Sequence, residues 1–164
     1  MARNEHLVFL PFDVPPDLER NYVFEVWHLF ARSLKVASHK LSPLKLSTRH
    51  YAAMAVLASS DRAATQSMLA KRLGLSPNIV VGMVDYLDRL GYTKRRQNPR
   101  NRRENIVQLS PKGRKAYGRA VRRLRQAEQE LLASLSKEEQ RHYMAIIDRL
   151  RRSASTQDLS VEFS

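Results

Sequence analysis

The sequence predicts a mainly α-helical fold of the α+β kind, a winged helix-turn-helix with a small β-hairpin wing between long terminal helices. Three observations lead to this prediction. Two short amphipathic segments, residues 66–73 and 77–90, are separated by a turn that contains glycine. Two extended segments with a turn-rich connection follow, at residues 92–96 and 105–109. Longer apolar repeats at helical spacing flank this central part on both sides.

The first short helix is predicted from Gln66 to Leu73. Thr65 is its expected N-cap, because a hydroxyl there can accept an otherwise unpaired backbone N–H. Gly74 is expected to end the helix, since glycine adopts the left-handed conformation without a Cβ penalty. Helical spacing predicts that one apolar face is made by Met68, Leu69 and Leu73.

The second short helix is expected to start at Ser76 and Pro77, with a capping hydroxyl and a proline at the first helical position. It should end near Gly91, and its buried stripe is predicted to consist of Val80, Met83, Val84 and Leu87. The second helix of such a motif can lie in the major groove of DNA.

The hairpin after this motif is the predicted wing. Residues 97–104 connect its strands and combine Asn, Pro and clustered arginines, which is typical of a turn. A further helix should begin at Ser110 and Pro111, again with a serine cap and a proline in the first turn.

Composition points to a polyanionic partner. The chain has 164 residues, enough for one domain, and a net charge of +13 from 29 Lys and Arg against 16 Asp and Glu. It has no cysteine, which excludes disulfides, thiol catalysis and a cysteine redox switch. Nucleic acid is favoured over a membrane surface because the basic residues gather on a hairpin and the start of the next helix. They are Lys94, Arg95, Arg96, Arg100, Arg102, Arg103, Lys112, Arg114, Lys115, Arg119, Arg122, Arg123 and Arg125.

The terminal segments suggest a dimer. A long helix is predicted from Asp17 to about Lys40, and Ser42-Pro43 should break it before a helix at 49–58 capped by Ser47 or Thr48. A long helix after the wing has a narrow seam suited to helix pairing, made by Ala116, Tyr117, Ala120, Val121, Leu124, Ala127, Leu131 and Leu135.

A capping box at Ser136 and Glu139 should open the last helix, with an inner face of Tyr143, Ile146, Ile147 and Leu150. We therefore expect dimerisation helices at 17–46 and 114–152 around a DNA-binding lobe at 47–113, within a single chain of residues 1–164.

The two ends are expected to differ in role. Residues 1–16 should be an extended arm packed on a partner subunit, with a disordered leader as the alternative. Residues 153–164 have the composition of a polar tail. No apolar run reaches the roughly 20 residues that a membrane-spanning helix needs, so a cytoplasmic protein without a membrane partner is expected.

The runs LAKRLGLSPNIVVGMVDYLDRLGY and NPRNRRENIVQLSPKG resemble the MarR family of bacterial multiple-antibiotic-resistance regulators. The resemblance extends in order and length of elements over about residues 18–152. It implies a homodimer formed by the terminal helices that binds double-stranded DNA at a pseudo-palindromic operator, more often as a repressor than as an activator. In the family, a crevice between the dimer helices and the DNA-binding lobe often holds a small aromatic or phenolic effector. The candidates here, with ordinary packing as the alternative, are Trp27, Phe30, Arg49, His50 and Tyr51.

The predicted recognition helix is unusually apolar. Where the resemblance implies polar residues facing the bases, this chain has Asn78, Ile79, Val81 and Gly82. Asn78 can bond adenine bidentately, Ile79 and Val81 can contact thymine methyls, and Gly82 permits close approach. Simple packing is an equal alternative for Ile79. Few direct contacts are expected, with much of the selectivity coming from DNA shape.

The wing is expected to supply the other contacts. Arg100 and Arg102 at its tip should enter a narrow minor groove. The family's wing typically has two aspartates, whereas this wing has Asn98 and Asn101, which add no charge attraction to arginine. The full predicted DNA-binding set is Ser76, Pro77, Asn78, Ile79, Val81, Gly82, Lys94, Arg95, Arg96, Arg100, Asn101, Arg102 and Arg103.

No catalytic pattern is found in the sequence. The five histidines lack metal-ligand spacing, and no nucleophile elbow or phosphate-binding loop is present, so we expect neither an enzyme nor a cofactor. Two alternatives to a regulator remain. One is an architectural DNA-binding protein that does not switch. The other is a protein-interaction adaptor that kept the fold, which the apolar recognition helix favours and the arginine wing opposes.

Overall fold

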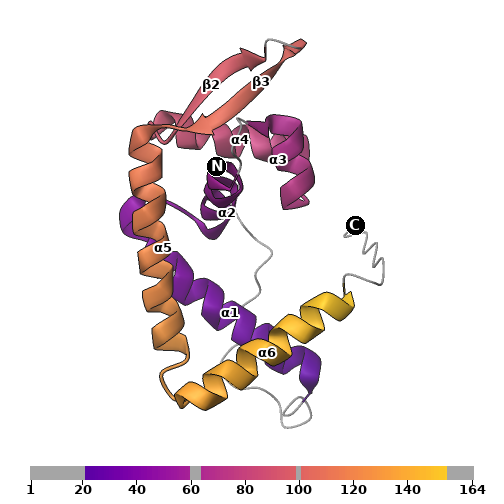
Figure 1. Cartoon of the computed structure of the whole chain (residues 1–164), viewed down its shortest axis with the longest axis vertical. Coiled ribbons are helices and arrows are strands. Elements are labelled where there is room, and N and C mark those ends of the chain that lie inside the picture. The colour runs from indigo at the N-terminus through magenta and orange to yellow at the C-terminus, as the bar shows by residue number, and fades with distance from the viewer. Residues whose placement is uncertain (1–20, 60–63, 99–100, 155–164) are drawn as a thin grey trace. The chain divides into compact units, whose positions relative to one another are not determined.

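The computed structural model describes residues 21–59, 64–98 and 101–154, with the side chains of 101–104 and 154 left out (Figure 1). The chain divides into two compact units, Met1–Ala127 and Glu128–Ser164. In chain order, the elements are α1 Tyr22–Leu41, η2 Ser42–Leu44, α2 Thr48–Ala58, β1 Ala64–Thr65, α3 Gln66–Leu73, α4 Pro77–Arg89, β2 Thr93–Asn98, β3 Asn101–Leu109, α5 Pro111–Leu131 and α6 Lys137–Ala154. The structure is thus mainly helical with one small sheet, as predicted.

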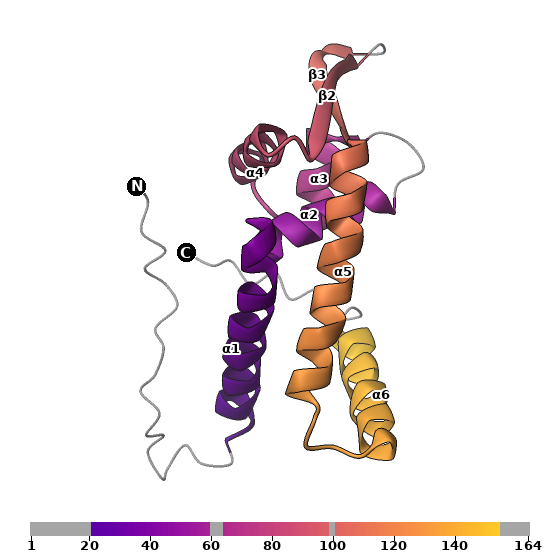
Figure 2. The ribbon, with the colours of Figure 1, turned by 90° about the vertical axis from the view of Figure 1, so that its left-hand side faces the viewer.

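The sheet is antiparallel, with β3 between β1 and β2. The β2–β3 hairpin is the predicted wing, and it extends away from α3 and α4 in both views (Figures 1 and 2). The prediction of a turn over residues 97–104 is wrong, because the strands continue through the basic residues until Asn98 pairs with Asn101. A register shift at Gln97 and Asn98 accompanies this lengthening. β1 was not predicted from the sequence, since two residues are too few to show strand alternation.

The first helix begins later than predicted. The Asn21 side chain caps α1 by accepting the N–H groups of Val23 at 3.1 Å and Phe24 at 3.5 Å. Asp17, the predicted start of this helix, and the arm at 1–16 lie outside the described residues, as does the tail from 155 on. The break at Ser42-Pro43 is confirmed as a short 3-10 turn, after which Lys45 adopts a left-handed conformation with φ of 56°.

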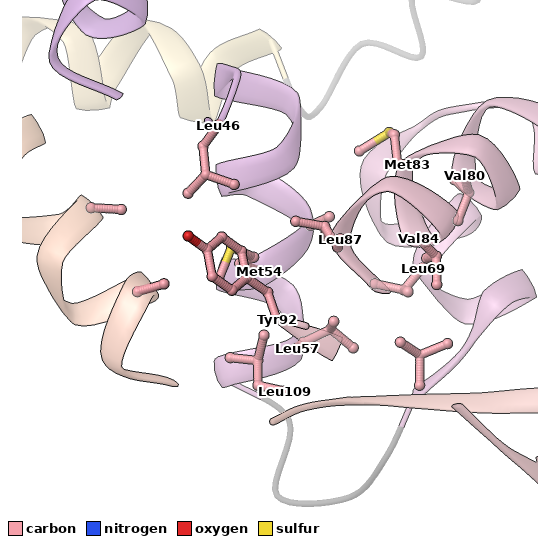
Figure 3. Packing of buried hydrophobic residues seen from close by; sticks show 14 of the residues in the cluster. Leu46, Met54, Leu57, Leu69, Val80, Met83, Val84, Leu87, Tyr92 and Leu109 are labelled. Carbon is pink, nitrogen blue, oxygen red and sulfur yellow. The ribbon is translucent and has the colours of Figure 1, made fainter. Parts of the chain in front are cut away.

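The core of the first unit lies where α2, α3, α4, the sheet and α5 meet. Figure 3 shows Tyr92 among Leu46, Met54, Leu57 and Leu109, and all five are buried. The predicted seam of α5 faces this same core. Ala116 and Ala120 are fully buried in it, and Tyr117 and Leu124 pack against it. These seam residues therefore pair α5 with its own chain, which corrects their prediction as a surface for helix pairing between subunits.

Tyr92 and Gly113 hold the start of α5 against the base of the wing. The Tyr92 hydroxyl donates to the Leu44 carbonyl at 3.3 Å, and the Ser110 N–H donates to the Tyr92 carbonyl at 3.0 Å. A Cβ atom at Gly113 would lie 1.9 Å from that carbonyl oxygen, so only glycine allows this approach. The Ser110 hydroxyl accepts the Gly113 N–H at 2.9 Å, which confirms the predicted cap.

In the second unit, the capping box of α6 is confirmed. The Ser136 N–H donates to Glu139 Oε2 at 2.7 Å, and the Glu139 N–H donates to Ser136 Oγ at 3.3 Å. These bonds lower the pKa of Glu139, because they favour its charged form. In the single chain, three residues of the predicted inner face, Ile146, Ile147 and Leu150, are exposed.

His50 joins the cap of α2 to the recognition helix. The ring Nδ1 atom of His50 accepts the backbone N–H of Ser47 at 3.2 Å, and the backbone N–H of His50 donates to Ser47 Oγ at 3.2 Å. Its ring stacks on Tyr86 of α4, with centroids 4.5 Å apart and planes 16° from parallel. The Tyr86 hydroxyl then donates to the Lys45 carbonyl at 2.8 Å. A neutral His50 therefore links α2, α4 and the turn before α2.

Burial lowers the pKa of His50 from its ordinary value of 6.5. The unfolded chain therefore binds more protons than the folded chain when the pH falls below that value. The stability that His50 contributes is complete above about pH 6.5 and is lost as the pH falls through the lower pKa of the folded state.

We predict that His50→Gln will flatten the acid side of the stability profile. Glutamine can keep the cap at this position, where it is a usual capping-box residue, but it does not titrate. The free energy of unfolding of wild type and variant should be measured by denaturant titration between pH 7.5 and 5. The difference in the free energy of unfolding between wild type and variant should become smaller as the pH falls. Parallel profiles over that range would show that His50 is not a titrating link.

Candidate nucleic-acid interface

The helix-turn-helix is formed by α3 and α4, as predicted. Thr65 caps α3 by accepting the Met68 N–H at 3.1 Å, and Gly74 ends it with φ of 62°. The turn then continues with a bond from the Leu75 N–H to the Ala70 carbonyl at 3.1 Å. The prediction that Met68 is on the buried face is wrong, because it is 52% exposed. It lies outside the arc that Leu69, Ala70 and Leu73 direct at the core.

The second helix buries the predicted stripe, Val80, Met83, Val84 and Leu87. It ends in a Schellman motif, in which the Gly91 N–H reaches the Asp88 carbonyl and the Tyr92 N–H reaches the Leu87 carbonyl, both at 2.8 Å. Gly91 has the positive φ, 70°, that this ending requires. At the other end Pro77 starts the helix, but the predicted side-chain cap is wrong, since the Ser76 hydroxyl makes no capping bond.

The outer face of α4 is the centre of the candidate interface. All six residues predicted to contact DNA from this element are exposed: Ser76, Pro77, Asn78, Ile79, Val81 and Gly82. Ile79 is 42% and Val81 39% exposed, which decides against the packing alternative for Ile79. Asn78 and Gly82 lie one turn apart on the middle of this face, with Ile79 on one side and Val81 on the other.

The wing strand β2 carries three of the predicted contacts in different settings. Lys94 is exposed. Arg95 forms an ion pair with Asp85 of α4, and its side chain is only 25% exposed. Arg96 donates to Gln108 of β3 at 3.0 Å. The ion pair between α4 and β2 was not predicted from the sequence. Arg95 is thereby assigned to holding the wing on the recognition helix.

The remaining predicted wing residues are only partly described. Arg100 lies outside the described residues. Asn101, Arg102 and Arg103 belong to β3, which fixes their backbone, while their side chains are outside the described part. Asn98, which replaces one of the expected aspartates, is half-buried at the end of β2.

The five candidate effector residues have separate neighbours. Trp27 makes an edge contact with His28, with ring centroids 5.3 Å apart, and Tyr51 stacks on Tyr117 of α5 at 5.6 Å. Burial, followed by the influence of Tyr117, raises the pKa of Tyr51. His50 stacks on Tyr86, and Phe30 and Arg49 are exposed. Within the described ranges, no ring contact or hydrogen bond joins any two of the five candidates.

Among the residues that the structure describes, no three His, Asp or Glu side chains gather as metal ligands would. In the same part of the chain, no helix has both the length and the apolar character needed to span a bilayer.

Comparison with known proteins matches residues 46–105 to the MarR family. A search of curated proteins finds no match. The transcriptional repressor CouR, solved on a 23-mer DNA duplex, is 20% identical with a TM-score of 0.75, covering 85% of this chain and 99% of its own. The PcaV transcriptional regulator of Streptomyces coelicolor is 21% identical with a TM-score of 0.71, covering 82% and 98%. A MarR family protein of Mycobacterium tuberculosis, in complex with DNA, is 21% identical with a TM-score of 0.69, covering 84% and 98%.

The matched residues contain α2, α3, α4 and most of the wing, which are the elements that build the candidate interface. The similar structures extend the fold over most of the chain on both sides. Residues 46–105 therefore match the MarR family, and the chain as a whole shares the fold of solved MarR family proteins.

Proposed function

We propose that this chain is a sequence-specific regulator that binds double-stranded DNA by placing α4 in the major groove, with the wing over the adjacent backbone and minor groove. The observation that carries the proposal is the outer face of α4. Its first two turns direct Asn78, Ile79, Val81 and Gly82 to solvent, while the opposite stripe anchors the helix in the core. A helix with one face packed on the core and the other face exposed is suited to enter a groove of DNA.

Charge supports the same proposal. The net charge of +13 is concentrated from Lys94 through Arg125, and phosphate contacts gain affinity by releasing counterions from DNA. The ion pair of Arg95 with Asp85 holds β2 on α4, so the two reading elements keep one geometry. Two of the similar proteins are described with DNA, which fits a DNA-binding role for this fold.

We further propose a homodimer on a pseudo-palindromic operator. Five large apolar side chains on α1 are 46% to 69% exposed: Tyr22, Val23, Val26, Leu29 and Phe30. A contiguous apolar face of this kind marks an interface in a soluble protein. A second copy of the chain would cover it and supply the second α4 that a two-fold site needs. On α6, Met144, Ile146, Ile147 and Leu150 are exposed as well, and a second copy of the chain could cover this apolar face too.

Repression is the proposed direction of regulation, because a dimer seated on a promoter blocks access to it. Release by a small aromatic or phenolic ligand remains part of the proposal. Such a ligand would act by binding more tightly to a dimer whose two α4 helices no longer match the operator spacing. Of the candidate residues, His50 contacts α4 through Tyr86, and Tyr51 contacts α5 through Tyr117.

We predict opposite signatures for two substitutions at the interface. Asn78→Ala should cost about 1–3 kcal/mol on the best site, cost little on random duplex and leave the salt dependence unchanged, because no charge is removed. Lys94→Gln should weaken binding to every duplex and reduce the salt slope by about one unit. Both predictions are tested by measuring the affinity of each variant for selected and random duplexes over a range of salt concentrations.

Lys137→Gln, on the exposed start of α6, is the matched control for the loss of one positive charge, and it should not change the salt slope. If wild type showed no preference for any duplex over random DNA, an architectural protein would be the better description. If the wild-type protein bound neither selected nor random duplexes, the alternative of a protein-interaction adaptor would be the better description. An Asn78→Ala protein that kept the wild-type ratio of specific to random affinity would show that Asn78 does not contact bases.

We predict that Val26→Glu combined with Phe30→Glu will yield a folded monomer. Both side chains are exposed in the single chain, so charge there should not disturb the core. Sedimentation should show half the wild-type mass, and circular dichroism should show unchanged helix content. Lys35→Glu, nine residues from Val26 and so on the opposite side of α1, is the control and should remain dimeric. A folded double variant with dimer mass would exclude this face from the interface.

A further inference from the structure

Gly82 has no explanation in the fold of the single chain. It lies in the middle of α4, where glycine is destabilising relative to alanine, and a Cβ atom added there would meet nothing within 4 Å. Its φ is not in the left-handed region, in contrast to Gly74 and Gly91. Gly113, by contrast, is required by the fold, because a Cβ atom added there would lie 1.9 Å from a backbone oxygen. Gly82 must therefore be explained by what approaches α4 from outside.

The surroundings of Gly82 form a notch between two apolar side chains. Ile79 and Val81 are exposed on either side of the bare backbone, and Asn78 lies one turn before it. The nearest charge later on the helix, Asp85, is held in the ion pair with Arg95. The first two turns of α4 thus present one amide, two branched hydrocarbon side chains and an open stretch of backbone.

This surface matches one chemical feature of the major groove. Base edges there present hydrogen-bond donors and acceptors, and only the C5 position of thymine adds an apolar group, a methyl. Ile79 and Val81 can form no hydrogen bond, so contact with a methyl group is the specific interaction open to them. The absent side chain of Gly82 would let the helix backbone come close enough for both to reach the base edges.

We propose that Ile79 and Val81 recognise C5-methyl groups of pyrimidines in the major groove, and that Gly82 provides the close approach this needs. The proposal rests on the proposed function and names what α4 recognises. Because 5-methylcytosine carries its methyl at the same ring position as thymine, the chain should also favour methylated over unmodified cytosine at those positions. Binding would then respond to cytosine methylation of the site.

The test begins with a duplex selected by the protein from random sequence. Each thymine in turn is replaced by deoxyuridine, which removes only the methyl group. At the contacted positions, affinity should fall about fourfold, the effect expected for one buried methyl group. Placing cytosine or 5-methylcytosine at the same positions should show the methylated base bound about fourfold more tightly. Uridine in random duplex should have no effect, because backbone contacts do not involve the methyl.

Two sets of variants connect the effect to α4. Val81→Thr keeps the branched shape and replaces one methyl by a hydroxyl, and Ile79→Thr shortens and polarises the other flank. Together they should remove the difference between thymine and deoxyuridine, without changing random-duplex affinity. Gly82→Ala fills the notch and should weaken selected-site binding, although it raises the melting temperature. Gly118→Ala in α5, where an added Cβ meets only Arg122 Nη1 at 3.9 Å, should raise the melting temperature and leave DNA binding unchanged.

The outcomes separate this inference from the proposed function. Clear preference for the selected duplex, with no uridine substitution costing more than twofold, would overturn the methyl inference and leave a sequence-specific regulator. A methyl effect that persists in the Ile79→Thr, Val81→Thr protein would overturn the assignment to these residues. Absence of any preference for selected over random duplex would overturn the proposed function and this inference together.

Discussion

The geometry of the DNA-binding lobe depends on the close approach of the start of α5 to the backbone of Tyr92. The Tyr92 carbonyl accepts the Ser110 N–H, and the absent side chain of Gly113 leaves the space that this oxygen occupies. The Tyr92 ring is buried in the core, and its hydroxyl reaches Leu44 before α2. One residue therefore fixes the end of α4, the base of the wing, α5 and the η2 turn. The exposed faces of α4 and the wing keep a constant relationship because their buried ends share this contact.

Much of the fold could be predicted because its signals are local. Thr65, Gly74, Ser110 and the box at Ser136 each mark a helix end through bonds between residues three or four apart, and all four are confirmed. Sequence signals failed to predict the elements whose length depends on pairing with a strand that is distant in sequence. The wing strands run longer than their apolar residues suggest, because the basic residues Lys94, Arg95 and Arg96 of β2 pair with residues of β3. The two residues of β1 are a strand only because β3 lies beside them.

The candidate site shows the same division. Helical period alone placed Val80, Met83, Val84 and Leu87 inside, and so placed Asn78, Val81 and Gly82 outside. The ion pair of Arg95 with Asp85 and the stack of His50 on Tyr86 join residues 10 and 36 apart in sequence, where no spacing rule applies. The clustering of aromatic residues near α1 and α2 in sequence did not predict shared contacts, because consecutive helical residues point in different directions.

We propose that affinity and selectivity come from different surfaces. Positive charge on the wing suits any duplex, while the apolar outer face of α4 has only base edges to recognise. The central claim is that these surfaces together select one DNA sequence as a two-fold complex. Selection of bound duplexes from a random library at moderate salt tests it most directly. We expect enrichment of one motif with two inverted half-sites whose centres are about one helical turn, roughly 10 base pairs, apart or a multiple of that distance. A library that stays random after repeated selection, despite retained binding, would contradict it.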